Sequence, residues 1–139
     1  MKKLFALCLI LTLFTSCIND DDNITQNSHV DILPIESVDI PSEFELGETY
    51  PITVSYLRPS TCHIILEDFA YAKENNQRTI APKTLIINED NCEALENELI
   101  EKSFNFTVTS NSSYIFRFWQ GRDADGESQY LIVEVPVND

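Results

Sequence analysis

The sequence predicts an all-β fold, a β-sandwich of about seven antiparallel strands. Three observations predict it. Apolar and polar side chains alternate over most of the chain from residue 31 onward, which is the period of a strand with one buried face. Turn-forming residues separate these alternating runs at roughly even spacing. Almost no segment shows the apolar period of an amphipathic helix.

The first half of the expected domain holds four alternating runs. The first run ends at Pro41, as an edge strand does, because proline cannot donate a hydrogen bond to a neighbouring strand. Pro82 falls inside the fourth run and therefore marks a bulge or an edge there. The four runs are residues 35–40, 50–56, 62–71 and 78–88, with turns expected at 45–48, 58–60 and 73–77.

The second half begins with an acidic segment, residues 89–98, that lacks alternation and could hold one helical turn around Ala94-Leu95. Three more alternating runs follow. In the first of them, Phe104, Phe106 and Val108 are expected to face the core. The three runs are residues 104–108, 114–119 and 129–137, separated by turns at 111–113 and 122–126.

The chain begins with the features of a bacterial secretion signal. Lys2 and Lys3 precede an apolar run of 11 residues, Leu4 to Phe14, which is too short to cross a hydrocarbon core of ~30 Å. The run leads into Leu13-Phe14-Thr15-Ser16-Cys17, which resembles the lipobox of bacterial lipoproteins, although Phe14 replaces the usual aliphatic residue. The resemblance implies that residues 1–17 are a lipoprotein signal peptide and that Cys17 is lipidated, with palmitate among its acyl chains.

An acidic segment follows this cysteine. Its sequence, Ile18-Asn19-Asp20-Asp21-Asp22-Asn23, resembles the export signal of surface-exposed lipoproteins of the Bacteroidota type; a solvated spacer is the alternative. Residues 18–30 have too little apolar content to pack, so we expect an acidic disordered tether there and a folded domain at residues 31–139. The expected location is the outer membrane, at the cell surface, with the lipid as the only membrane contact.

Charge limits the classes of partner. The chain has 23 acidic and 9 basic residues and a net charge of −14 at pH 7, and two of the basic residues belong to the expected leader. Such a surface repels phosphate backbones and anionic headgroups, which disfavours nucleic-acid binding and electrostatic docking to a membrane. Most acidic surfaces of this kind are simply solvated.

Two cysteines remain after the expected leader, because Cys8 lies within it and Cys17 carries the lipid. The remaining pair, Cys62 and Cys92, predicts a disulfide in an exported chain, with free buried thiols as the alternative. Closing a loop of about 30 residues contributes roughly 3.5 kcal/mol in the chain-entropy description. A catalytic pair of Cys62 and His63 is disfavoured, because adjacent side chains of a strand point to opposite faces.

The strand pattern of residues 31–137 resembles that of immunoglobulin-like or fibronectin-type domains. Tyr114 begins the sixth expected strand, where such domains often place a corner tyrosine. The antibody-type disulfide is missing, since Cys62 and Cys92 do not fall on the second and sixth strands, and Trp119 comes late on the sixth strand. Many small exported lipoproteins of uncharacterised function have this design.

The last hairpin allows its register to be predicted. The apolar positions of residues 114–118 and 131–135 must share the core face, and a turn centred on Ala124-Asp125 then brings them opposite one another. The predicted pairs on the core face are Phe118 with Leu131 and Phe116 with Val133, and those on the other face are Trp119 with Tyr130 and Arg117 with Ile132.

That other face carries the candidate ligand-binding residues: Arg117, Trp119, Tyr130 and Ile132. One interpretation is structural. Trp119 and Tyr130 then form a cross-strand aromatic pair that stabilises the hairpin by about 0.5–1 kcal/mol, or a loop lies over this pair. The functional interpretation is an aromatic platform for a sugar ring or a partner protein, because arginine, tryptophan and tyrosine are enriched where binding energy concentrates.

No motif for catalysis, metal or cofactor binding is found. Asp123-Ala124-Asp125-Gly126 resembles part of a calcium loop, but the acidic ligands required at its first and last positions are missing. The only histidines, His29 and His63, lie outside any cluster with metal-ligand spacing. We therefore expect no cofactor and no enzyme activity.

The sequence favours a lipid-anchored module of the cell envelope that binds a glycan or a protein, or serves as an accessory subunit. A different possibility is a small inhibitor or stability factor acting through the loop at residues 89–98. A hydrolase is a third possibility, since the chain has many carboxylates but no spacing that indicates a catalytic pair.

Overall fold

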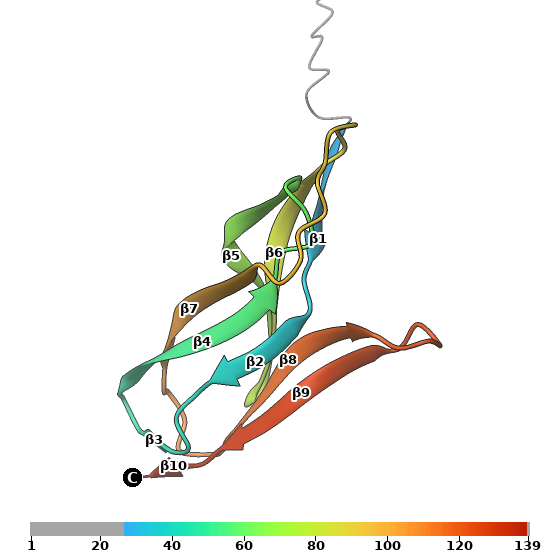
Figure 1. Cartoon of the computed structure of the whole chain (residues 1–139). Coiled ribbons are helices and arrows are strands. Elements are labelled where there is room, and N and C mark those ends of the chain that lie inside the picture. The colour runs from blue at the N-terminus through green and yellow to red at the C-terminus, as the bar shows by residue number, and fades with distance from the viewer. Residues whose placement is uncertain (1–26, 139) are drawn as a thin grey trace, which may run out of the picture.

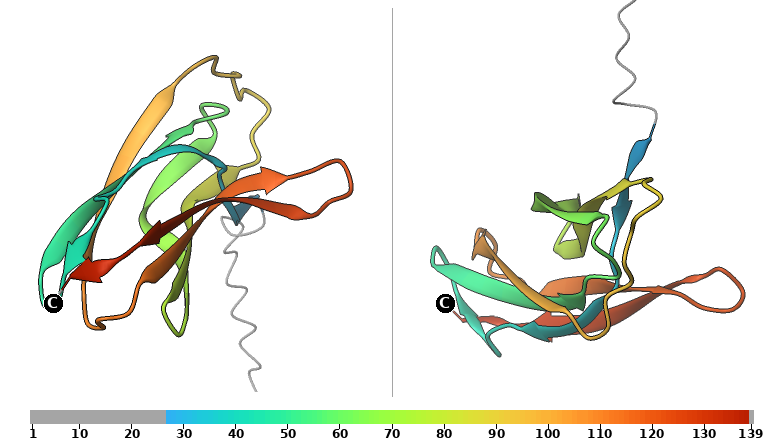
Figure 2. Two further views of the ribbon diagram at one scale, coloured as in Figure 1. Left: turned by 90° about the horizontal axis from the view of Figure 1, so that it is seen from below. Right: turned by 45° about the horizontal axis from the view of Figure 1, so that its top comes forward.

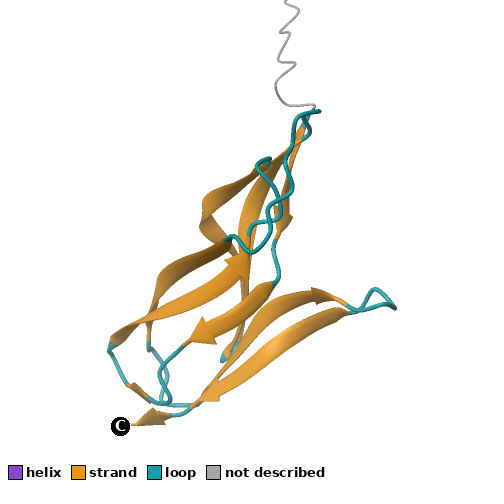
Figure 3. Ribbon diagram, viewed as in Figure 1, coloured by secondary structure: helices purple, strands orange, loops and turns teal. Residues whose placement is uncertain are grey.

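The computed structural model describes residues 27–138, and in this range the chain consists of strands and turns without a helix (Figures 1 and 3). The all-β prediction is therefore confirmed. The predicted signal peptide, Cys17 and most of the predicted tether lie outside the described residues. The strands, in chain order, are β1 (Ser28–Ile32), β2 (Ile35–Asp39), β3 (Phe44–Glu45), β4 (Thr49–Leu57), β5 (His63–Glu74), β6 (Gln77–Ile87), β7 (Leu99–Thr107), β8 (Tyr114–Arg122), β9 (Ser128–Val135) and β10 (Val137–Asn138).

The strands form two main sheets that enclose a common core (Figure 2). The five-stranded sheet has the order β1-β6-β8-β9, with β5 paired to β6, and the three-stranded sheet has the order β2-β4-β7. Strands β3 and β10 form a small parallel ribbon at the end of the molecule where the described chain finishes (Figure 1). The architecture is consistent with the β-sandwich that the alternation predicts.

The core is aromatic and lies between the sheets. Tyr114, Phe116 and Phe118 of β8 are completely buried, while the residues between them are more exposed, so β8 shows the predicted alternation. Phe44 packs at the centre, with ring centroids 5.5 Å from Phe106 and 6.0 Å from Phe116. Burial of such a side chain contributes about 1.5–3 kcal/mol, so these rings supply much of what holds the two sheets together.

Strand β6 changes partner along its length. Residues 77–80 pair with β8 in parallel, whereas residues 83–87 pair with β1 in antiparallel fashion. Pro82 lies between these two stretches, next to a register shift in the β5–β6 ladder, which fits the predicted bulge. The expectation of purely antiparallel pairing is wrong for β6 and β8. The strand of the β5–β6 hairpin that lies beside β8 is β6, which runs parallel to β8, whereas β5 runs in the opposite direction.

Strand β1 corrects the predicted tether boundary. It begins at Ser28, so the prediction of a tether is wrong for residues 28–30. Val30 pairs with Leu85 of β6, yet 55% of its surface remains exposed. Backbone pairing holds this strand to the sheet, and a largely exposed strand leaves no apolar alternation from which it could be predicted.

Tyr114 connects the start of β8 to the turn before it. Its hydroxyl oxygen accepts hydrogen bonds from the backbone N–H groups of Thr109, at 3.1 Å, and Ser110, at 2.9 Å. The side chain thereby ties the start of β8 to the turn that precedes it, as a corner tyrosine does in sandwich domains. Its ring is completely buried.

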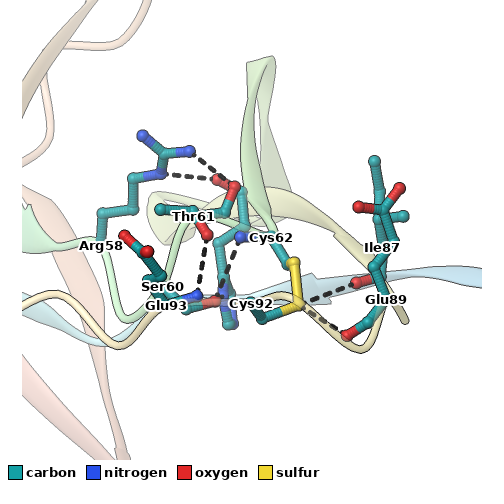
Figure 4. The surroundings of a disulfide bond; sticks show 9 residues. Arg58, Ser60, Thr61, Cys62, Ile87, Glu89, Cys92 and Glu93 are labelled. Carbon is teal, nitrogen blue, oxygen red and sulfur yellow. Dashed lines mark hydrogen bonds between the residues drawn. A yellow bond between two sulfur atoms is a disulfide. The ribbon is translucent and has the colours of Figure 1, made fainter.

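The predicted disulfide joins Cys62 to Cys92, with Cα atoms 5.4 Å apart (Figure 4). The segment that carries Cys92 is further held by Thr61, whose backbone N–H donates to the Glu93 carbonyl and whose Oγ1 accepts from the Glu93 N–H, each at 3.0 Å. Ala94 forms an antiparallel bridge with Ser60, so the helical turn expected near Ala94 is wrong. Backbone pairing with the β4–β5 connection takes the place of a helical turn.

Candidate functional site

The β8–β9 hairpin has the predicted register. All four predicted pairs are present: Phe118 with Leu131, Phe116 with Val133, Trp119 with Tyr130, and Arg117 with Ile132. Phe116 and Phe118 are completely buried, whereas Trp119 and Tyr130 are only partly buried. The aromatic pair therefore lies on the outer face of the five-stranded sheet, away from the core.

Side-chain contacts fix this aromatic pair. The Trp119 Nε1–H donates to Ser128 Oγ at 3.2 Å, which sets the plane of the indole. The Arg117 guanidinium carbon lies 4.0 Å from the centroid of the Tyr130 ring, within the range of a cation–π interaction. Ile132 has 60% of its surface exposed, which leaves an apolar side chain beside the arginine.

The β8–β9 hairpin separates from β6 at the point where β6 changes its pairing partner from β8 to β1. Strand β8 pairs with β6 only as far as Phe118, and the end of the hairpin then projects away from the rest of the sheet, as all views show (Figures 1 and 2). Strand β1 takes up the vacated edge of β6 from Lys83 onward. The sheet thus forks between β1 and β8, and the fork opens a concave surface on its outer face.

This concave surface, which we call the outer hollow, has a volume of about 320 Å³. That volume is at the lower end of the range for small-ligand sites, roughly 300–1,000 Å³. Trp119 and Tyr130 line the hollow together with small residues of β5 and β6, and Thr79, Ser128 and Arg122 supply polar groups. The small residues are Ala70, Ala72 and Ala81.

A bulge brings Arg122 to the hollow. Between Trp119 and Gly121 the pairing with β9 shifts by one residue, so Arg122 lies opposite Ser128. Since Ser128 and Tyr130 are two residues apart on β9, they share a face, and Arg122 joins them on it. Gly121 has φ = 103°, a conformation that glycine adopts without strain.

The sequence prediction and the structure overlap in part at this site. Trp119 and Tyr130 line the hollow, whereas Arg117, which contacts the Tyr130 ring, and Ile132 are outside the hollow lining. Arg122 was missed because the sequence analysis assigned it to the turn at residues 122–126, whereas β8 extends through it and pairs it with Ser128. Alanines at every second position, Ala70 and Ala72, are a signal that could have indicated an outer face of unusually small side chains.

A second polar arrangement bears on the hydrolase possibility. Ser60 Oγ lies 2.7 Å from His63 Nδ1, the distance of a nucleophile–base pair. Burial, and next the charge of Arg58, lower the pKa of His63 from its usual value of 6.5. Ser60 Oγ also accepts the Cys62 N–H at 3.3 Å, and the Ser60 carbonyl accepts the His63 N–H, so these groups close the turn before β5.

Ser60 and His63 line neither the outer hollow nor the hollow beside residues 74–77. Over residues 27–138 there is no cluster of three or more histidine, cysteine or acidic side chains that could hold a metal ion. No helix in this part of the chain is long and apolar enough to cross a membrane. The outer hollow is therefore the arrangement best suited to a ligand.

No protein-family model, curated protein or solved structure shows significant similarity to this chain. Function has to be argued from the geometry of the outer hollow.

Proposed function

We propose that this chain is a lipid-anchored module of the cell envelope that binds a saccharide in the outer hollow. The observation that carries the proposal is the hollow itself, walled by Trp119 and Tyr130 at the fork of the sheet. Aromatic rings offer a flat apolar surface to the C–H groups of a sugar ring, and nearby polar groups can bond its hydroxyls. Thr79, Ser128 and Arg122 are placed for that second task.

The shape of the site favours a saccharide over a protein partner. A standard protein interface buries about 800 Å² on each partner and is usually flat, with bulky anchors at its centre. Here the floor of the hollow contains Ala70, Ala72 and Ala81, and such short side chains leave room for a ring to enter. A protein partner remains the second candidate, supported by the exposed Ile132 next to Arg117.

The inhibitor hypothesis has a narrower basis. The segment at residues 89–98 is acidic and largely exposed, but the disulfide and its bonds to Thr61 hold it against the β4–β5 connection. Deleting it would remove part of the fold. A charge-reversal variant, Glu89→Lys with Asp90→Lys, is therefore the better test of a role in binding, with binding to an envelope protein as the readout.

The proposed anchor is the acylated Cys17, in the outer membrane and at the cell surface. Its support is the basic, apolar and lipobox sequence of residues 1–17 and the acidic residues that follow. Metabolic labelling with an alkyne-bearing palmitate should label the wild-type protein and leave Cys17→Ala unlabelled. Protease digestion of intact cells should remove the domain. Labelling of Cys17→Ala, or full protection from protease, would refute the anchor or the surface location.

The saccharide site is tested by binding to an oligosaccharide array, followed by calorimetry with each saccharide found. Trp119→Ala combined with Tyr130→Ala should abolish binding while the domain stays folded, because both side chains are only partly buried. Ile115→Ala is the matched control, since Ile115 lies on the outer face of the same strand and outside the hollow lining. Undiminished binding by the double variant would overturn the proposal.

A further inference from the structure

We infer that the saccharide of the outer hollow is acidic and that Arg122 binds its anionic group. This inference rests on the proposed saccharide site and narrows its ligand to sugars bearing a carboxylate or a sulfate. The observations behind it are the position of Arg122, the charge of the hollow lining and the partners of the other basic residues.

Arg122 lies in the wall of the hollow, on the same face as Ser128 and Tyr130. One of its terminal nitrogens, Nη1, donates to the Gly126 carbonyl at 2.9 Å, which orients the guanidinium. Its other N–H groups have no hydrogen-bond partner among the described residues. Arginine presents its donors as a planar fork that matches the two oxygens of a carboxylate or sulfate, so the remaining donors suit an anionic ligand.

The lining of the hollow contains no acidic residue, although 23 acidic residues occur in the chain. The carboxylate of Asp123, the residue next to Arg122 in sequence, accepts hydrogen bonds from other residues of the hairpin. Its Oδ1 accepts the N–H groups of Asp125 at 3.0 Å and Glu127 at 2.9 Å, and its Oδ2 accepts the Gln129 amide at 2.8 Å. Within residues 27–138, Arg122 has no carboxylate oxygen within the 4.0 Å of an ion pair.

Two other basic side chains form ion pairs. Arg58 pairs with Glu98 at 3.3 Å, and Lys83 pairs with Asp68 at 2.5 Å. Arg117 and Arg122 form no ion pair in the described part of the chain, and both belong to β8 and flank the aromatic pair. In so acidic a chain, an arginine in the wall of a hollow without acidic lining makes a local site of positive potential that favours an anion over a neutral ligand.

The test uses oligosaccharides in matched pairs, each with one charged and one neutral member. The pairs are trigalacturonate with its methyl ester, and a sulfated galactan oligomer with its desulfated form. Calorimetry with the intact domain should show tighter binding of a charged member than of its neutral counterpart, and this preference should weaken as NaCl rises from 50 to 300 mM, as expected of a largely solvent-exposed charge pair. The first pair reports on a carboxylate and the second on a sulfate.

Arg122→Gln should reduce binding of the charged member about tenfold more than binding of the neutral member, because only the charged member loses a charge-assisted contact. Lys73→Gln is the matched control, since it removes the same charge from an exposed position outside the hollow lining. Equal binding of charged and neutral members, or an unchanged preference in Arg122→Gln, would overturn the acidic-ligand inference and leave the saccharide site standing. Absence of binding by every saccharide would overturn both proposals.

Discussion

The guanidinium of Arg117 lies 4.0 Å from the centroid of the Tyr130 ring on the neighbouring strand. Arg117 pairs directly with Ile132, so its side chain reaches diagonally across the ladder to the tyrosine. Its Nε atom is buried without a hydrogen-bond partner in the described structure. The arginine is therefore held against the ring of Tyr130, which lines the hollow.

This contact should be measurable as a coupling energy. Arg117→Met keeps the length of the side chain and removes its charge, and Tyr130→Leu removes the ring. In a double-mutant cycle we expect a coupling of about 0.5–1 kcal/mol in the free energy of unfolding, the size of a partly exposed cation–π contact. Urea denaturation followed by Trp119 fluorescence measures it. Strictly additive effects would show that the stacking contributes nothing.

The disulfide should stabilise the domain substantially. Replacing both Cys62 and Cys92 by serine opens a loop with a sequence separation of 30 residues. We expect a loss of about 3.5 kcal/mol in the free energy of unfolding, from the greater entropy of the unfolded chain. Urea denaturation of the double variant, compared with the oxidised wild type, checks this. Equal midpoints and slopes would contradict it.

Core packing gives a third prediction. Phe116→Ala should lower the free energy of unfolding by about 3–5 kcal/mol, because Phe116 is completely buried among other aromatic rings and its loss leaves a cavity. Ile115→Ala, one residue away, should cost much less, since 38% of the surface of Ile115 is exposed. If the two variants lost equal stability in urea, the assignment of inner and outer faces of β8 would be wrong.

Stability should also depend on pH through His63. Because its pKa is lowered in the folded state, the unfolded chain binds a proton more readily, and protonation favours unfolding. The stabilising effect of the neutral His63 side chain is complete above its pKa in the unfolded chain, about 6.5. This effect is lost as pH falls from there through the lower pKa of His63 in the folded state. Thermal midpoints between pH 7.5 and 5.5 should fall less for His63→Gln than for the wild type. Identical slopes would refute the assignment.

Alternation predicted most of the sandwich because it reports directly on burial. Where a strand has one face in the core, as β8 does, the apolar side chains recur at every second position and identify both the strand and its inner face. The register of β8 with β9 followed from the same fact together with the turn centred on Ala124-Asp125, which brings Phe116 opposite Val133 on the core side. The outer positions of Trp119 and Tyr130 followed in turn.

Features that do not depend on burial could not be predicted. Strand β1 is held by backbone pairing with a largely exposed surface, so its sequence resembles a tether. The parallel contact of β6 with β8 depends on which strand of the β5–β6 hairpin lies beside β8, and alternation does not report this choice. The bulge after Trp119 has Gly121 as its local signal, and it decides that Arg122 reaches the hollow.

Trp119 is the only tryptophan of the chain, so its indole N–H gives a single side-chain resonance in a ¹⁵N-resolved NMR spectrum. The most direct test of the saccharide site is to follow this resonance while an oligosaccharide bound on the array is added. The account predicts a saturable shift whose midpoint matches the calorimetric affinity. A saccharide that binds with that affinity and leaves the indole resonance unmoved would contradict it.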